Sequence, residues 1–130
     1  MDSQATPSIA AALEQMVRTG APATQIASAV AETWRQVDHS LTAVIGPQGV
    51  LALYKRSLML TARAHPWLGP QVRAEDTVDV AQFTAALAQQ ESHIAALAGG
   101  DFLQIFYGLV NSLLGPSLTR RLLGFMWQSP

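Results

Sequence analysis

Three basic side chains in the middle of the chain have the spacing of a binding face. Arg56 and Arg63 are seven residues apart, which places them on one stripe of a helix, and Lys55 flanks them. Two guanidinium groups on one face can hold a phosphate or a carboxylate. The alternative is a solvated helix face whose charges pair with acidic residues of a neighbouring helix. We take Lys55, Arg56 and Arg63 as candidate ligand-binding or partner-binding residues, together with Trp67, which lies in an expected loop between prolines.

Charge is segregated along this part of the sequence. Between Asp38 and Glu75 there are four basic residues and no acidic residue, whereas between Arg73 and Arg120 there are five acidic residues and no basic one. Neutralisation across neighbouring helices would explain this pattern. The alternative is a basic face that meets an anionic ligand or an acidic partner. The acidic residues that could pair with the basic face within the chain are Glu75, Asp79 and Glu91.

The histidines do not have the spacing of a metal or hydrolytic site. His39, His65 and His93 lack the close pairing of zinc ligands, and the chain has no cysteine. The sequence also contains no Gly-x-Ser-x-Gly elbow and no glycine-rich phosphate loop. His65 precedes Pro66, where an imidazole can meet the last carbonyls of a helix. We therefore expect no enzymatic activity, no metal and no cofactor.

His39 is expected on the exposed side of a helix, opposite the apolar stripe. The run His39-Ser40-Leu41-Thr42-Ala43, followed by Gly46 and Gly49, resembles the phosphoacceptor segment of histidine phosphotransfer domains. Those domains are also helical bundles of about this size, and the resemblance implies a phosphoacceptor role for His39. The sequence departs from the family pattern at Thr42, where the family has a lysine that helps to neutralise the phosphoryl charge.

Hydrophobic periodicity predicts an all-α protein, a compact bundle of five or six helices. Apolar residues recur at helical spacing along the chain, and no stretch alternates with period two for long enough to indicate a strand. The bundle is expected to be one domain over residues 1–130, in which residues 1–22 hold a loosely attached N-terminal helix. The expected helices span about Ser8–Arg18, Thr24–Ile45, Val50–Ala64, Val78–Ala98, Phe102–Leu114 and Ser117–Trp127.

Two Gly-Pro pairs are expected to separate helices. Val44-Ile45-Gly46-Pro47 and Leu113-Leu114-Gly115-Pro116 each end one apolar helical stretch and open another. Glycine after a helix end can adopt the left-handed conformation, and proline suits the first turn of the next helix. The pattern predicts two related helical hairpins, which reflect either an old duplication or a chance alignment of amphipathic helices. A further turn is expected at Gly99-Gly100-Asp101.

Two apolar stripes favour association of the chain with itself. Charged residues make up only 13% of the sequence and hydrophobic residues 49%, so charged side chains cover little of the surface. The polar residue Gln90 lies within the apolar stripe of the fourth helix. Its buried amide could pair with the same amide of a second copy across a two-fold interface. We therefore predict a homodimer through the fourth helix, although both stripes could instead pack inside one bundle. The stripe of the second helix is Val30, Trp34, Val37, Leu41 and Val44, and the expected interface residues of the fourth are Phe83, Leu87, Gln90 and Ile94.

Composition excludes several other classes of function. The net charge of −1 does not attract nucleic acid or anionic membranes, and the aromatic residues do not interleave with the basic ones. Phe102–Thr119 carries no charge, but polar residues interrupt it, which favours a buried core helix over a membrane span. The first residues lack the basic and apolar regions of a secretory signal, so we expect a cytoplasmic protein.

Several short segments within residues 30–127 resemble small uncharacterised bacterial proteins of signal-transduction settings. The resemblance implies no particular activity, but it favours a regulatory role. We therefore expect a non-enzymatic regulatory or adaptor module that acts through a protein–protein interface, as a homodimer or with another protein. The alternatives are a small-molecule-sensing domain for an anionic or apolar ligand, and a histidine phosphotransfer protein. The segments are Val44-Ile45-Gly46, Gly49-Val50, Ala52-Leu53-Tyr54-Lys55-Arg56-Ser57-Leu58, Pro66-Trp67-Leu68, Ser117-Leu118-Thr119 and Arg121-Leu122-Leu123.

Overall fold

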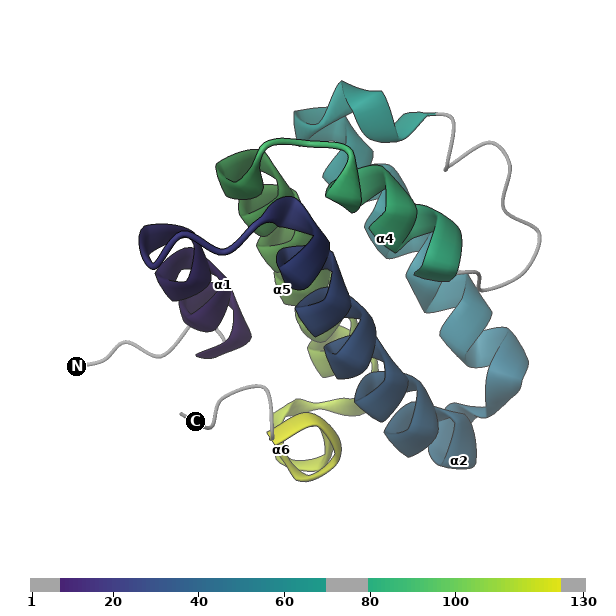
Figure 1. The fold of residues 1–130 in the computed structure, drawn as a ribbon. Coiled ribbons are helices and arrows are strands. Elements are labelled where there is room, and N and C mark those ends of the chain that lie inside the picture. Colours follow the sequence, from purple (N-terminus) through teal and green to yellow (C-terminus); the bar gives the residue numbers. More distant parts are fainter. Residues whose placement is uncertain (1–7, 70–79, 125–130) are drawn as a thin grey trace.

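The computed structural model describes residues 8–69 and 80–124, and within these ranges the regular structure is helical throughout. Figure 1 shows the helices arranged as a bundle with α5 through its middle. The all-α prediction is confirmed. The expected helix ends at Val78 and Trp127 lie outside the described residues. The helices are α1 (Ser8–Arg18), α2 (Ala23–Ala64), the short 3₁₀ helix η1 (Pro66–Leu68), α4 (Val80–Ala88), α5 (Ser92–Leu114) and α6 (Pro116–Leu123).

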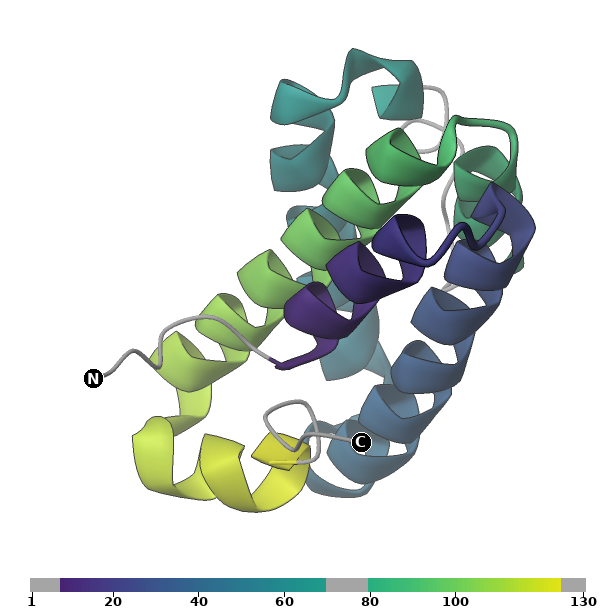
Figure 2. The same cartoon turned by 60° about the vertical axis from the view of Figure 1, so that its left-hand side comes forward.

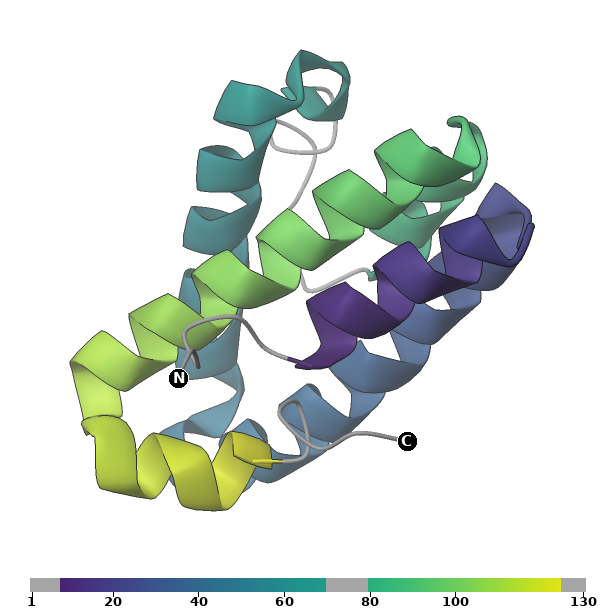
Figure 3. The same ribbon diagram turned by 90° about the vertical axis from the view of Figure 1, so that its left-hand side faces the viewer.

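The long element α2 consists of two helical halves joined at a corner. Gly46 at this corner has φ 79° and ψ 165°, and Pro47 starts the returning half. Gly115 has nearly the same conformation, with φ 88° and ψ 159°, and Pro116 then starts α6. Figures 1 and 3 show the two halves of α2 running in opposite directions. Both glycines have the expected positive φ, but their ψ is not that of a left-handed helix; it belongs to an extended region that essentially glycine alone adopts.

Aromatic rings from three helices form the centre of the core. Trp34 in the first half of α2 lies edge-on to Phe106 of α5, with 4.9 Å between the ring centroids. Tyr54 in the returning half lies 5.3 Å from Trp34, and Phe102 of α5 lies 4.7 Å from Phe83 of α4. Such pairs contribute about 0.5–1.5 kcal/mol each beyond the area that they bury. They hold both halves of α2 against α4 and α5 around one core.

The apolar stripe on the first half of α2 is used inside the bundle. Val30, Val37 and Leu41 have no exposed surface, and only Val44 at the end of the stripe is 47% exposed. These side chains pack in the core that α2 shares with α5. The stripe therefore packs in its own bundle, which was the alternative to a coiled-coil seam.

The turn expected at Gly99-Gly100-Asp101 is wrong. The helix instead breaks after Ala88, at residues 89–91, and α5 runs through both glycines. A Cβ atom at Gly99 would lie 2.7 Å from Cγ2 of Val30, and one at Gly100 would lie 3.5 Å from Cβ of Ala10. Glycine is required at position 99 because it lets α2 approach α5 closely, whereas a Cβ atom at Gly100 would make only an ordinary contact with α1; the chain turns at neither glycine.

The N-terminal helix α1 runs alongside α5 (Figure 2). Leu13 has no exposed surface and belongs to the same core as α2 and α5. The Oγ hydroxyl of Ser92 donates a 2.8 Å hydrogen bond to the carbonyl of Ala21, which ties the turn after α1 to the start of α5. The helix is therefore attached to the bundle both by apolar packing and by this hydrogen bond.

Among the described residues, α5 is the helix that is long and apolar enough to cross a membrane. Half of its apolar window is buried inside the bundle. Phe102 and Phe106 in this window pack against Trp34 of the same chain. Packing within the chain therefore accounts for the buried half of this apolar window.

Candidate functional site

The returning half of α2 carries an exposed basic face. Lys55, Arg56 and Arg63 are all exposed, as their spacing predicted, and Met59 between them is 38% exposed. We call Lys55, Arg56, Met59 and Arg63 the basic face. No ion pair joins these three cations to an acidic side chain within residues 8–69 and 80–124. By contrast, Arg35 pairs with Glu32 on its own helix.

The acidic residues expected to neutralise the basic face do not all fall within the described residues. Glu75 and Asp79 lie outside them, as does Arg73. Glu91 is described, and its carboxylate lies 3.6 Å from the ring of His93 rather than against a cation of the basic face. The described part of the chain therefore shows three cations that face solvent without a charge partner.

The opposite side of the same helix is firmly anchored. Ser57 and Thr61 have no exposed surface, and Leu58 is 1% exposed. The hydroxyl of Thr61 donates a 2.7 Å hydrogen bond to the carbonyl of Ser57, which satisfies this polar group inside the bundle. Because this side is buried over more than one turn, the backbone that presents the basic face is held in place.

A histidine–carboxylate pair closes the C-terminal end of α2. Nε2 of His65 lies 2.9 Å from Oδ2 of Asp101 in the middle of α5, and the histidine side chain is 7% exposed. The backbone N–H of His65 donates to the carbonyl of Thr61, while its imidazole makes this cross-helix contact instead of meeting the last carbonyls as expected. The pair therefore joins the end of α2 to the middle of α5.

Trp67 does not lie on the stripe of the basic face. It belongs to η1, where its ring meets the ring of His65 edge-on, 6.1 Å away. Trp67 also lines a shallow surface hollow with a volume of about 470 Å³, which it shares with Gln90. Trp67 and Gln90, which were expected on different surfaces, therefore line the same hollow, and Trp67 does not belong to the basic face. The other lining residues are Gln82, Ala85, Ala86 and Gln89.

The expected dimer interface on the fourth helix requires correction. Phe83 and Leu87 have no exposed surface in the single chain and belong to its own core. Gln90 lies in the bend between α4 and α5, and Ile94 lies beyond it in α5. The four residues therefore do not form one continuous stripe, because the helix that was to carry them ends at Ala88.

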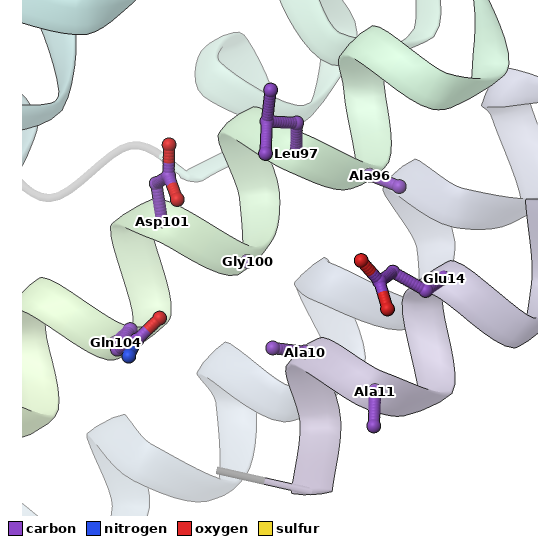
Figure 4. Close-up of a pocket in the computed structure, with 8 residues that line it drawn as sticks. All are labelled: Ala10, Ala11, Glu14, Ala96, Leu97, Gly100, Asp101 and Gln104. Atoms are coloured by element: carbon purple, nitrogen blue, oxygen red, sulfur yellow. The ribbon is translucent and has the colours of Figure 1, made fainter. Parts of the chain in front are cut away.

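A groove between α1 and α5 was not predicted from the sequence (Figure 4). Its volume is about 200 Å³, and two acidic residues, Glu14 and Asp101, are among its lining residues. Figure 4 shows the side chain of Asp101 pointing away from α1, and its carboxylate is the one that contacts His65. Leu97 in this lining is 57% exposed. We call this surface the α1–α5 groove, and its remaining lining residues are Ala10, Ala11, Ala96, Gly100 and Gln104. The spacing of the small residues Ala96 and Gly100, four apart, was the available sequence signal for this close helix contact.

The histidines other than His65 lie at the surface. His39 is exposed on α2, as expected, and beside it the hydroxyl of Thr42 donates a 3.0 Å hydrogen bond to Asp38. His93 is exposed near the start of α5. Within the two described ranges, no group of three histidine or carboxylate side chains is placed to hold a metal ion. A phosphoacceptor role for His39 stays a prediction.

Comparison with known proteins adds no family assignment. No protein-family model, no characterised protein and no solved structure matches this chain significantly. The function must therefore be inferred from the surfaces described above.

Proposed function

We propose that this protein is a non-enzymatic regulatory or adaptor module, and that the basic face of α2 is the surface through which it binds an acidic partner protein. The observation that carries the proposal is the group of three exposed cations without an ion pair in the described part of the chain. Unpaired surface cations keep their full capacity for charge-assisted hydrogen bonds with carboxylates.

The composition of the basic face suits a protein partner. Met59 at its centre is an exposed, flexible apolar side chain, and such side chains adapt to varied partner surfaces. Arg56 and Arg63 lie on the same stripe, and arginine is enriched among the residues that contribute most to protein interfaces. The apolar centre would supply contact area, while the surrounding cations would supply orientation and speed of association.

The anchoring of α2 supports the same proposal. Ser57, Leu58 and Thr61 hold the reverse side of the helix in the core, so the basic face has a defined backbone before any partner arrives. Binding to such a surface loses little backbone entropy. A preorganised face is what an adaptor requires, since its task is recognition rather than chemistry.

The setting of the proposal follows the expectations from the sequence. The segments quoted above favour a bacterial module of signal transduction, the first residues of the chain favour a cytoplasmic one, and a partner can be a second copy of the chain or another protein. The proposal differs in the surface that it uses, because burial removes Phe83 and Leu87 from any interface. The small-molecule-sensing and phosphotransfer alternatives stay predictions, and retention of a phosphoryl group by the wild type but not by His39→Ala would support the latter.

Co-purification from the native cell tests the proposal. The wild-type chain and the Arg56→Gln/Arg63→Gln variant serve as baits, and mass spectrometry quantifies the proteins retained by each. The matched control is Arg120→Gln/Arg121→Gln, which removes the same charge from exposed positions on α6. We expect an acidic protein that the wild type and the α6 control retain and that the basic-face variant loses at least tenfold. Equal retention by all three baits would contradict the proposal.

A further inference from the structure

Apolar and charged side chains repeat with one spacing along the basic face. Met59 is exposed, and Arg63 follows it by four residues. Seven residues before Met59, exposed Ala52 has the same relation to Arg56. We propose that the acidic partner binds this surface through a helix of its own, which carries two carboxylates seven residues apart beside an apolar stripe. This inference rests on the proposed function, because it specifies the structure that the same basic face recognises.

The repeat of the basic face is the one by which two helices pack side by side. Residues seven apart lie on the same side of a helix, and Arg56 and Arg63 are therefore about 10 Å apart along the axis of α2. In paired helices, apolar residues form the line of contact, and charged residues beside this line form ion pairs between the helices. Ala52 is small, so a partner backbone can approach closely at its level, while Met59 supplies an apolar contact further along.

A helix fits this surface better than an extended peptide does. Extended peptides commonly bind by adding main-chain hydrogen bonds to the edge of a sheet. The basic face offers no such bonds, because the backbone groups of α2 around it are paired inside the helix. No sheet edge is present within residues 8–69 and 80–124 either. Side chains alone are therefore left to recognise the partner, and a helix presents its side chains with the matching period.

The complementary pattern is absent from this chain itself. Its nine acidic residues include no two that are seven residues apart. In the described ranges, Glu14 and Glu32 also pair with arginines of their own helices. The partner helix therefore belongs to a different protein, and not to a second copy of this chain.

Binding of synthetic helical peptides to the full chain tests this inference. Each peptide has a host sequence of alanine and glutamine with about 20 residues, which is long enough to form a helix. The matched peptide carries two leucines seven residues apart and a glutamate four residues after each leucine. The mismatched peptide has the same composition, but each glutamate follows its leucine by two residues and lies on the opposite side of the helix. Circular dichroism establishes that both peptides are equally helical, and fluorescence anisotropy measures their affinities.

We expect the wild type and the Arg120→Gln/Arg121→Gln control to bind the matched peptide at least about fivefold more tightly than the mismatched one. Arg56→Gln/Arg63→Gln should bind the two peptides equally. Arg56→Glu/Arg63→Glu should instead prefer the matched peptide in which lysines replace the glutamates, since this exchange restores the opposite charges. All the substituted side chains are exposed, so each variant should melt at the wild-type temperature.

Equal affinity of the wild type for the two peptides, or no binding of either, would overturn the inference. So would tighter binding of a proline-containing, non-helical peptide whose two glutamates are three residues apart, which places them about 10 Å apart in an extended chain. The co-purification experiment separates this failure from failure of the proposed function. If Arg56→Gln/Arg63→Gln still loses an acidic protein from the cell extract, the basic face binds an acidic surface of another form; if it loses none, the proposed function fails as well.

Discussion

Replacing Gly99 by alanine tests the packing of α5 on α2. An alanine Cβ atom at this position would lie 2.7 Å from Cγ2 of Val30, well inside van der Waals contact. Val30 is fully buried, and its β-branched side chain has one strongly preferred rotamer in a helix. The two helices must therefore separate, or Val30 must leave its rotamer. Overpacking of this kind costs about 1–3 kcal/mol.

Gly108 provides a matched control on the same helix. A Cβ atom at Gly108 would meet nothing within 4 Å, and the residue is exposed. Alanine in a helix interior is about 0.8–1 kcal/mol more favourable than glycine, and both variants receive this gain. Gly108→Ala should therefore stabilise the protein by about 1 kcal/mol, and Gly99→Ala should be less stable than Gly108→Ala by about 1–3 kcal/mol.

Urea unfolding followed by circular dichroism measures both free energies. Gly100→Ala separates the packing explanation from a turn at this point, because a Cβ at Gly100 would meet Ala10 at 3.5 Å, an ordinary contact distance. Packing predicts that Gly100→Ala is neutral or stabilising, whereas a turn that needs glycine predicts a loss at both positions. Equal stability of Gly99→Ala and Gly108→Ala would refute the close approach of Val30 to α5.

Four further variants test other parts of the structure. Gly46→Ala and Gly115→Ala should each lower the free energy of unfolding by about 1–3 kcal/mol, because alanine cannot adopt their positive φ and extended ψ without strain; unchanged urea midpoints would contradict those corners. Arg56→Gln/Arg63→Gln should change the free energy of unfolding by less than about 0.5 kcal/mol, since both side chains are exposed and neither guanidinium forms an ion pair with another described residue, and a large loss in thermal melts would reveal a structural network. His65→Ala should cost about 1–3 kcal/mol, since it leaves the partner carboxylate on α5 without its hydrogen bond, and a variant as stable as wild type would show that this contact does not join the helices.

The exposure of the basic face could be predicted from the sequence because the returning half of α2 is strongly sided. Steps of 100° place Lys55, Arg56 and Arg63 on one half of the helix and Tyr54 and Leu58 on the other half, and the structure exposes the first three and buries the other two. The helix periodicity alone carries this information. No knowledge of the neighbouring helices is needed, since the apolar side must face a core of some kind.

The break between α4 and α5 could not be predicted in the same way. Residues 89–91 contain neither glycine nor proline, so no local breaker marks the bend, while Gly99 and Gly100 are strong local breakers in a place where the helix continues. At Gly99 a tertiary contact accounts for the glycine, because Val30 of α2 approaches α5 where a Cβ atom would lie. Because residues 99–101 were expected to form a turn, the sequence did not predict the α1–α5 groove, whose lining includes Gly100 and Asp101.

Burial and charge together explain why a polar rather than an apolar surface is left for recognition. The apolar stripes that suggested a dimer interface are buried inside the chain. Trp34 and Leu41 of α2 and Phe83 and Leu87 of α4 all pack in one core. Few large apolar side chains therefore remain exposed, and they stand apart from one another along the chain. In a sequence with only 13% charged residues, three cations on one anchored helix face, with no ion pair to any residue in 8–69 or 80–124, are a marked concentration of charge. A surface of this kind selects partners by charge and register more than by buried area, which is the behaviour expected of an adaptor whose contacts must form and separate.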